Sequence, residues 1–193
     1  MITCKQITKR FGNVTALAPF DLSLDKGEFV AIKGASGSGK TTLLLALGGM
    51  LRPTAGEINY KGSDLYGRSS ASLAEYRSKE VGFVFQMFHL VPYLAVEENV
   101  KLALPNGNNS DRALELLEQF GLTDRLTHTP GELSAGERQR VALARALVSE
   151  PEMILADEPT GNLDPENDRQ VFKYLSEYHQ KGGTVAVVTH GST

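Results

Sequence analysis

The sequence of 193 residues contains one cysteine, no surplus of positive charge and no long apolar run. Cys4 has no second cysteine with which to form a disulfide, which favours a reducing compartment and a packing role for its side chain. The formal net charge of −3 gives no bulk indication of nucleic-acid binding. The longest apolar run, residues 43–51, contains two glycines and is too short to span a bilayer. Residues 1–13 lack an apolar core, so we expect no signal peptide.

The remaining composition favours one α/β domain. Hydrophobic residues make up 41% of the chain, which is enough for an adequate core. Patterning predicts strands at 1–10, 21–25, 28–32, 57–60, 81–85, 153–158 and 184–189, and helices at 42–47, 69–78, 111–120, 138–149 and 166–181. The first strands indicate a small β-rich region. We interpret residues 88–130 as a helical subdomain inserted between strands of the main sheet.

Residues 34–41, Gly-Ala-Ser-Gly-Ser-Gly-Lys-Thr, match the phosphate-loop pattern G-x-x-x-x-G-K-[ST]. They lie between a predicted strand and a predicted helix, which is the context that the motif requires. Glycines let the backbone approach a phosphate and point its N–H groups at it, whereas the alternative is a plain Gly/Ser-rich turn. In this loop Lys40 would reach the β- and γ-phosphates and Thr41 would ligate Mg²⁺. The predicted nucleotide-binding residues are Gly34, Ala35, Ser36, Gly37, Ser38, Gly39, Lys40, Thr41 and Thr42.

Four polar side chains lie at the carboxyl ends of predicted strands, where open α/β sheets bind ligands. Asp157 suits Mg²⁺, and Glu158 would polarise the water that attacks a γ-phosphate. Gln86 would present its carbonyl to Mg²⁺ or orient a water, and His190 would sense the γ-phosphate. Each also has a plain interpretation as a solvated or structural strand end. Their shared position beside the phosphate loop favours the functional interpretation.

Two further features have both structural and functional interpretations. Ser134 and Glu137 have the S-x-x-E spacing of a capping box, and the same helix start, with Gly136, would also suit an anion. Phe11 would stack on adenine or pack in the core. Asp164 and Pro165 favour the start of a helix.

In this order the motifs resemble those of the nucleotide-binding domain of ATP-binding cassette (ABC) transporters, over essentially the whole chain. The correspondences are Phe11 to the adenine-stacking aromatic, residues 34–41 to Walker A, Gln86 to the Q-loop, residues 133–137 to the signature motif, residues 153–157 to Walker B, Glu158 to the catalytic carboxylate, residues 162–164 to the D-loop and His190 to the switch histidine. Walker A marks a P-loop NTPase, and the signature motif ahead of Walker B marks this family.

The resemblance implies the ABC ATPase fold, an α/β P-loop NTPase. A RecA-like core and an antiparallel β region would span residues 1–87 and 131–193, with the helical subdomain at about 88–130. It implies hydrolysis of ATP with Mg²⁺, coupled to transport. Two copies, as a homodimer or pseudo-dimer, would sandwich ATP between Walker A of one and Ser134, Gly136 and Glu137 of the other. The resemblance also implies that the protein lies in the cytoplasm, on the inner face of the cell membrane. Residues 86–94, with the helical subdomain, would hold an integral permease subunit there. No nucleic-acid partner is expected.

Residues 83–92 and 155–164 resemble the subgroup of macrolide exporters, lipoprotein-release ATPases and a cell-division ATPase. The sequence departs from the family pattern at Ala135, where a glycine is usual, and at Glu137, where glutamine is common. Ala95 stands where the subgroup often has threonine. Three residues follow His190, where members usually continue with another strand and helix.

Two other functions are alternatives to an ABC transporter subunit. A non-transport ABC ATPase acting on nucleic acid or ribosomes would have long coiled-coil or zinc-binding insertions, or a tandem second cassette. A small-molecule kinase would have an acceptor pocket and lid arginines, and would leave residues 133–137 unexplained. The sequence favours an ATPase subunit that powers a transporter or a mechanotransmission complex.

Overall fold

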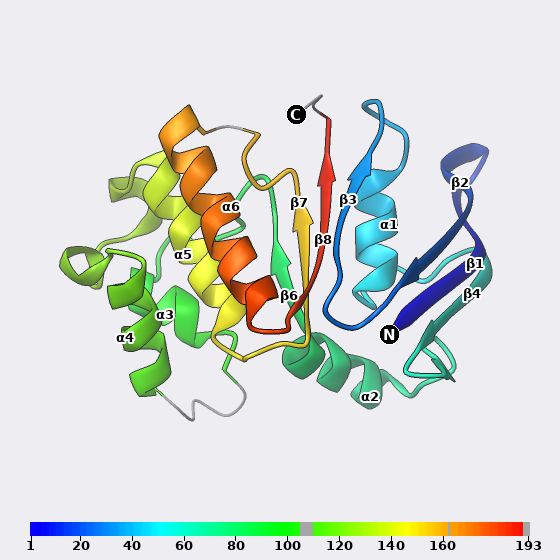
Figure 1. The fold of residues 1–193 in the computed structure, drawn as a ribbon, viewed down its shortest axis with the longest axis horizontal. Helices are drawn as coiled ribbons and strands as arrows, with labels where there is room; N and C mark the ends of the chain where they lie inside the picture. The colour runs from blue at the N-terminus through cyan, green and yellow to red at the C-terminus, as the bar shows by residue number, and fades with distance from the viewer. Residues whose placement is uncertain (105–109, 162, 191–193) are drawn as a thin grey trace.

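Two β-sheets form the framework of the molecule, with helices between them and on the outer face of one sheet (Figure 1). The computed structural model describes residues 1–104, 110–161 and 163–190. Within these ranges, no helix has both the length and the apolar character needed to cross a membrane. The arrangement confirms the predicted α/β class with an antiparallel region at the N-terminus.

The antiparallel sheet has the order β2-β1-β4-β5 and contains β1 (Ile2–Phe11), β2 (Val14–Leu24), β4 (Ala55–Tyr60) and β5 (Ser63–Asp64). The β1–β2 hairpin turns at Gly12, whose φ of 57° lies in the left-handed region open to glycine. The predicted strand at 21–25 is longer in the structure and begins at Val14. Pro19 does not interrupt it because an edge strand has a free side that needs no N–H donor.

The parallel sheet has the order β3-β8-β7-β6 and contains β3 (Phe29–Lys33), β6 (Val81–Val84), β7 (Met153–Asp157) and β8 (Thr184–Thr189). The central strands β7 and β8 are buried almost throughout, as expected for strands covered on both faces. All four strands run in one direction, so their carboxyl ends share one edge, which is the upper edge in Figure 1.

Helix α1 (Lys40–Leu47) lies between the two sheets (Figure 1). Its side chains Leu43, Leu44 and Leu47 are buried in one core cluster with Ile2 of the antiparallel sheet and Leu155 of the parallel sheet. Its amino end therefore points toward the edge where the parallel strands end. This packing holds the phosphate loop in place from both sides.

Helices α5 (Ala135–Leu147) and α6 (Pro165–Gln180) cover the opposite face of the parallel sheet (Figure 1). They share a second core with α3 (Val96–Lys101) and α4 (Ser110–Gln119). The predicted helix at 138–149 begins earlier, at Ala135, because Ser134 and Glu137 cap it reciprocally. The helix predicted from residue 111 begins at Ser110.

The predicted helix at 69–78 consists of α2 (Ser70–Glu75) and a π-helical turn at Tyr76–Glu80. Residues 88–130 contain α3, α4 and short 3₁₀ turns at Thr123–Arg125 and Pro130–Glu132. The division of the chain into a core and a helical subdomain stays a prediction.

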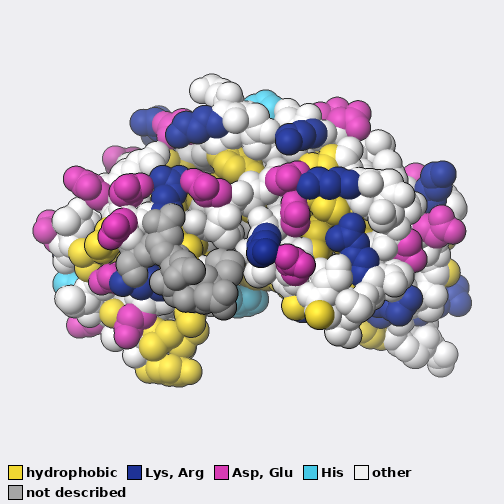
Figure 2. Space-filling view, turned by 90° about the horizontal axis from the view of Figure 1, so that it is seen from below, with side chains coloured by type: hydrophobic (Ala, Val, Ile, Leu, Met, Phe, Trp, Pro, Cys, Tyr) yellow, Lys and Arg dark blue, Asp and Glu magenta, His cyan; other side chains and the backbone are white. Residues whose placement is uncertain are grey.

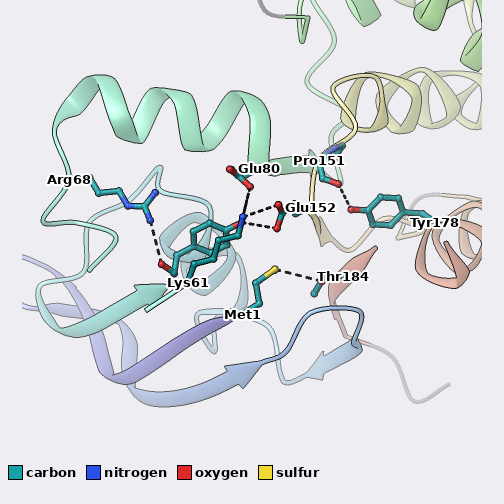
Figure 3. A network of polar contacts seen from close by, with 9 residues as sticks. Met1, Lys61, Arg68, Glu80, Pro151, Glu152, Tyr178 and Thr184 are labelled. Carbon is teal, nitrogen blue, oxygen red and sulfur yellow. Dashed lines mark hydrogen bonds and ion pairs between the residues drawn. The ribbon is translucent and has the colours of Figure 1, made fainter. Parts of the chain in front are cut away.

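A polar network ties the two sheets together at the amino ends of the parallel strands, away from the predicted site (Figure 3). The Lys61 amine pairs with Glu80 at 3.3 Å and with Glu152 at 2.8 Å. The Tyr60 hydroxyl donates to Glu80 at 2.9 Å, and its burial together with these carboxylates raises the pKa of the phenol. Because these contacts join the antiparallel sheet to the segments that enter β6 and β7, we assign this network a structural role.

Candidate nucleotide site

The carboxyl ends of the parallel strands bring together residues from four distant parts of the chain. Strand β3 leads into the phosphate loop, and Gln86 follows β6. Asp157 ends β7 and Glu158 follows it, while His190 follows β8. A cavity of about 400 Å³ opens at this edge. It is lined by the predicted residues Ser36, Gly37, Gly39, Lys40, Thr41, Thr42, Gln86, Glu158 and His190, and by Ala16, which sequence analysis missed.

The phosphate loop has the backbone that its glycines permit. Gly37 and Gly39 have φ values of 75° and 91°, which side chains rarely tolerate. A Cβ on Gly39 would lie 2.4 Å from the carbonyl oxygen of Ala16, so this close approach also requires glycine. The Lys40 amine donates to the carbonyl oxygens of Gly34 at 2.7 Å and Ala35 at 2.9 Å. The loop and the amino end of α1 therefore form a pocket suited to anions.

Thr41 of the cavity wall and the aspartate that it contacts, Asp157, have oxygens that suit a hard cation. The Thr41 hydroxyl donates to Oδ2 of Asp157 at 2.7 Å. Oδ1 of Asp157 is buried and has no hydrogen-bond partner among the described residues. A buried carboxylate oxygen without a partner is costly, and Mg²⁺ prefers such oxygen ligands. The donor set therefore fits the predicted metal position.

Three polar residues that line the cavity, Glu158, His190 and Lys40, contact one another in series. The carboxylate of Glu158 pairs with Nε2 of His190. The Lys40 amine lies 3.2 Å from Nδ1 of the same imidazole. Because an ammonium can only donate, Nδ1 accepts and Nε2 carries the proton toward Glu158. Glu158 has a φ of 44°, an uncommon value for a glutamate, and strained residues of this kind cluster at functional sites.

Gln86 lies beside the loop that follows Glu158. A Cβ on Gly161 would be 3.1 Å from the amide nitrogen of Gln86, so glycine leaves room for that side chain. Phe11 is not among the lining residues of the cavity, and 54% of it is exposed at the end of the β1–β2 hairpin. Its exposure excludes the alternative of a core phenylalanine, and adenine stacking stays a prediction. Asn162 of the predicted D-loop lies outside the described residues.

The predicted signature residues lie elsewhere on the same side of the molecule, at the amino end of α5 (Figure 1). Ser134 is exposed and its hydroxyl accepts from the N–H of Glu137 at 3.2 Å. The Glu137 carboxylate accepts from the N–H of Ser134 and from Arg125, each at 2.8 Å. These bonds lower the pKa of Glu137 to about 2. The chain does not bring these residues into the cavity formed by its own phosphate loop.

Comparison with known families agrees with this layout. A family model described as ABC transporter matches residues 17–161, which is more than half of the chain. The chain belongs to the ABC transporter family. Membership confirms the predicted class of function, an ATP-binding and ATP-hydrolysing subunit of a transporter, over the two alternatives weighed from the sequence.

Relatives within the ABC transporter family include two lipoprotein-releasing system ATP-binding proteins LolD. The protein from Syntrophotalea carbinolica is 44% identical over 193 residues, covering 97% of this chain and 85% of its own length. The protein from Syntrophus aciditrophicus is 45% identical over 203 residues, covering 100% of this chain and 91% of its own length. Both fall within the subgroup that residues 83–92 and 155–164 resemble.

Solved structures of the ATP-binding cassette MJ0796 share the fold of this ABC family member. A dimeric post-hydrolysis state bound to ADP and Pi has a TM-score of 0.90 and 38% identity, covering 99% of this chain and 88% of that one. A second dimeric structure of MJ0796, described as a bacterial ABC transporter cassette, gives the same values. The likeness confirms the predicted ABC ATPase fold.

Three residues that support the site were not predicted, because no motif or pattern in the sequence indicates them. Ala16 lies within a β-strand and reaches the cavity because β2 passes behind the phosphate loop. Arg125 neutralises Glu137 from a short 3₁₀ turn. Asn167 packs behind Gly136, where an added Cβ would lie 2.1 Å from its amide oxygen. Each acts through a contact between segments that no local pattern encodes.

Proposed function

We propose that this chain is the ATPase subunit of a transporter of the lipoprotein-release type, and that residues 34–42, 86, 157, 158 and 190 bind and hydrolyse Mg²⁺-ATP. The lining of the 400 Å³ cavity supports the assignment of residues 36, 37, 39–42, 86, 158 and 190, and the hydrogen bond from Thr41 supports that of Asp157. The names of the LolD relatives support the class of cargo. The observation that carries the proposal is the set of contacts Glu158–His190–Lys40 among residues that line the phosphate-loop cavity.

The metal would be held by Thr41 and Asp157, with the side-chain carbonyl of Gln86 facing it. When bound, Mg²⁺ would offset negative charge on the phosphates. The unpartnered Oδ1 of Asp157 supports this placement. Thr41 and Asp157 are already joined by a hydrogen bond, which holds their oxygens close together.

The chain's own residues would carry out the proton transfer. Glu158 would accept a proton from the attacking water, and its carboxylate is held in place by His190. His190 is in turn oriented by Lys40, which would also neutralise phosphate charge. Lys40 would exchange its present carbonyl partners for phosphate oxygens, since both accept hydrogen bonds from an ammonium.

A second copy of this chain would complete the site. Ser134 is exposed at the start of α5, where backbone N–H groups and the helix dipole favour an anion. These groups lie outside the chain's own cavity, so they would reach a nucleotide bound to another copy. Ion pairing with Arg125 offsets the charge of Glu137, which would otherwise repel phosphate.

The membrane partner would dock beside β6, which would place the chain on the inner face of the cell membrane. A cavity of about 550 Å³ there is lined mainly by apolar side chains, with Arg77, His89 and Arg145 as its basic groups. Met87 and Tyr93, in the segment between β6 and α3, are 68% and 81% exposed. We propose that an amphipathic segment with an acidic residue occupies this cavity, because no acidic side chain is among its described lining residues.

The surface gives no support for a nucleic-acid partner on the face drawn in Figure 2. Basic and acidic side chains are interspersed across this view, and hydrophobic side chains gather on a projection at its lower edge. Binding of a phosphate backbone requires a concentrated basic patch. The mixed charges agree with the expectation of a protein partner.

The test of the proposed function is the mass of Glu158→Gln in solution, measured by light scattering with and without ATP. We expect a monomer without nucleotide and a dimer with it, because the substitution blocks proton transfer but keeps the binding groups. Adding Ser134→Arg should abolish the dimer without weakening ATP binding to the monomer, since Ser134 lies outside the cavity. A Glu158→Gln protein that binds ATP tightly and remains monomeric would contradict the proposed sandwich.

A further inference from the structure

The loop that follows Gln86 has a strained backbone. Phe88 and His89 are consecutive non-glycine residues with left-handed φ values of 60° and 47°. The N–H of His89 donates to the carbonyl oxygen of Met87 at 2.6 Å, which closes a three-residue turn across Phe88. Such conformations persist only where the surroundings enforce them, so other contacts must hold this loop.

Arg145 of α5 supplies those contacts. One guanidinium nitrogen donates to the carbonyl oxygen of His89 at 2.6 Å, and the other donates to that of Phe88 at 2.8 Å. The planar guanidinium thus grips both strained residues at once, which an ammonium could not do with the same geometry. Arg138, two helical turns earlier on the same face of α5, lies over the Phe88 ring at 5.6 Å.

This contact joins three functional regions of the proposed ATPase. The loop begins at Gln86, which lines the nucleotide cavity. Helix α5 begins beside Ser134, which is proposed to meet the nucleotide of a second copy. Arg145 itself lines the proposed docking cavity. Arg145 therefore offers a direct route by which a displacement of α5 or of the docked partner would reach the loop that begins at Gln86.

We propose that Arg145 is a positioning residue that fastens the Gln86 loop to the signature helix and so keeps Gln86 at the nucleotide. The inference rests on the proposed function, because it assigns Gln86 a role in hydrolysis. A purely structural role for Arg145 would predict loss of stability without a selective effect on the loop. The two alternatives differ in one respect: only a positioning role predicts that the loss of kcat becomes smaller when the strain in the loop backbone is relieved.

The kinetic test compares Arg145→Lys in the natural background and in a His89→Gly background. We expect Arg145→Lys to lower kcat by about tenfold or more, as small misplacements of a catalytic group do, with ATP affinity changed by less than about twofold. In the His89→Gly background the loss should fall to about threefold or less, because glycine adopts a left-handed φ without strain. Equal losses of kcat in both backgrounds would overturn the proposal, as would an unchanged kcat.

A matched control is Arg112→Lys, which alters ion pairs of α4 with Glu115 and Glu150 away from the loop. Arg112→Lys should leave kcat unchanged both in the natural background and in the His89→Gly background. Arg145→Gln, which has one donor nitrogen, serves as a second variant if Arg145→Lys does not fold.

Hydrogen exchange tests the contact without any need for hydrolysis. Arg145→Lys should accelerate exchange at the N–H groups of Phe88 and His89 by about tenfold, while amides of α1 keep their rates. Unchanged exchange in the loop would overturn the inference even if the chain is an active ATPase. If the natural protein neither hydrolyses ATP nor forms the ATP-dependent dimer, the proposed function fails, and the exchange result still decides whether Arg145 holds the loop.

Discussion

Glu137 is the residue whose replacement tests the local energetics of the signature helix most directly. One carboxylate oxygen accepts from the N–H of Ser134 at 2.8 Å, and the other accepts from Arg125 at 2.8 Å. The side chain is 18% exposed, so these bonds are largely shielded from water. Glu137→Gln retains one acceptor oxygen for Ser134 but places an amide N–H₂ against the Arg125 guanidinium, which can only donate.

The magnitude follows from the pKa of Glu137, which falls from an ordinary 4.5 to about 2. Each pKa unit corresponds to about 1.4 kcal/mol, so the ionised side chain contributes at most roughly 3–4 kcal/mol to the free energy of unfolding. Because glutamine preserves the bond to Ser134, we expect Glu137→Gln to cost about 1–2 kcal/mol at pH 7. The pKa is lower in the folded state, so the contribution is full above about pH 4.5 and is lost as the pH falls toward 2.

The assay is urea unfolding of the natural protein and Glu137→Gln at a series of pH values from 7 downward. The difference in unfolding free energy should be largest at neutral pH and should shrink below about pH 4.5. Glu132→Gln is the matched control, because Glu132 caps a turn through Thr129 but forms no ion pair with a residue that the structure describes. A pH-independent difference, or an equal loss in the control, would refute the assignment of stability to the charged pair with Arg125.

Two further substitutions test packing and capping. Gly136→Ala should lower the free energy of unfolding by about 1–3 kcal/mol, because its Cβ would lie 2.1 Å from the amide oxygen of Asn167. Gly131→Ala, whose Cβ has no neighbour within 4 Å, should leave the free energy of unfolding almost unchanged. Thermal denaturation of both variants measures this difference. Ala95→Thr should raise the unfolding free energy by about 1 kcal/mol, because it supplies a hydroxyl acceptor at the N-cap of α3. Ala95→Val adds similar bulk without that acceptor and should show no such gain.

Local patterns in the sequence predict the parts of the site that lie within one continuous segment or at the end of a strand. The phosphate loop is one continuous segment, and its glycines specify its left-handed turns. Gln86, Glu158 and His190 each lie at the carboxyl end of a predicted strand, and parallel strands bring these ends to one edge. Asp164 was predicted as a helix cap, and its carboxylate accepts from the N–H groups of Glu166 and Asn167. Periodicity and capping act within a few residues, so a sequence records them.

Contacts between groups that are distant in the sequence depend on how the elements pack. Arg145 reaches the carbonyl oxygen of His89 across 56 residues of sequence, and nothing local to either residue indicates the pair. The orphaned Oδ1 of Asp157 and the histidine tautomer set by Lys40 depend likewise on how β7, β8 and α1 are packed. These contacts arise from the relative placement of rigid elements, which is set by core packing over the whole domain. A local pattern can therefore name the chemical groups of this site, but only the packed fold determines which of them touch.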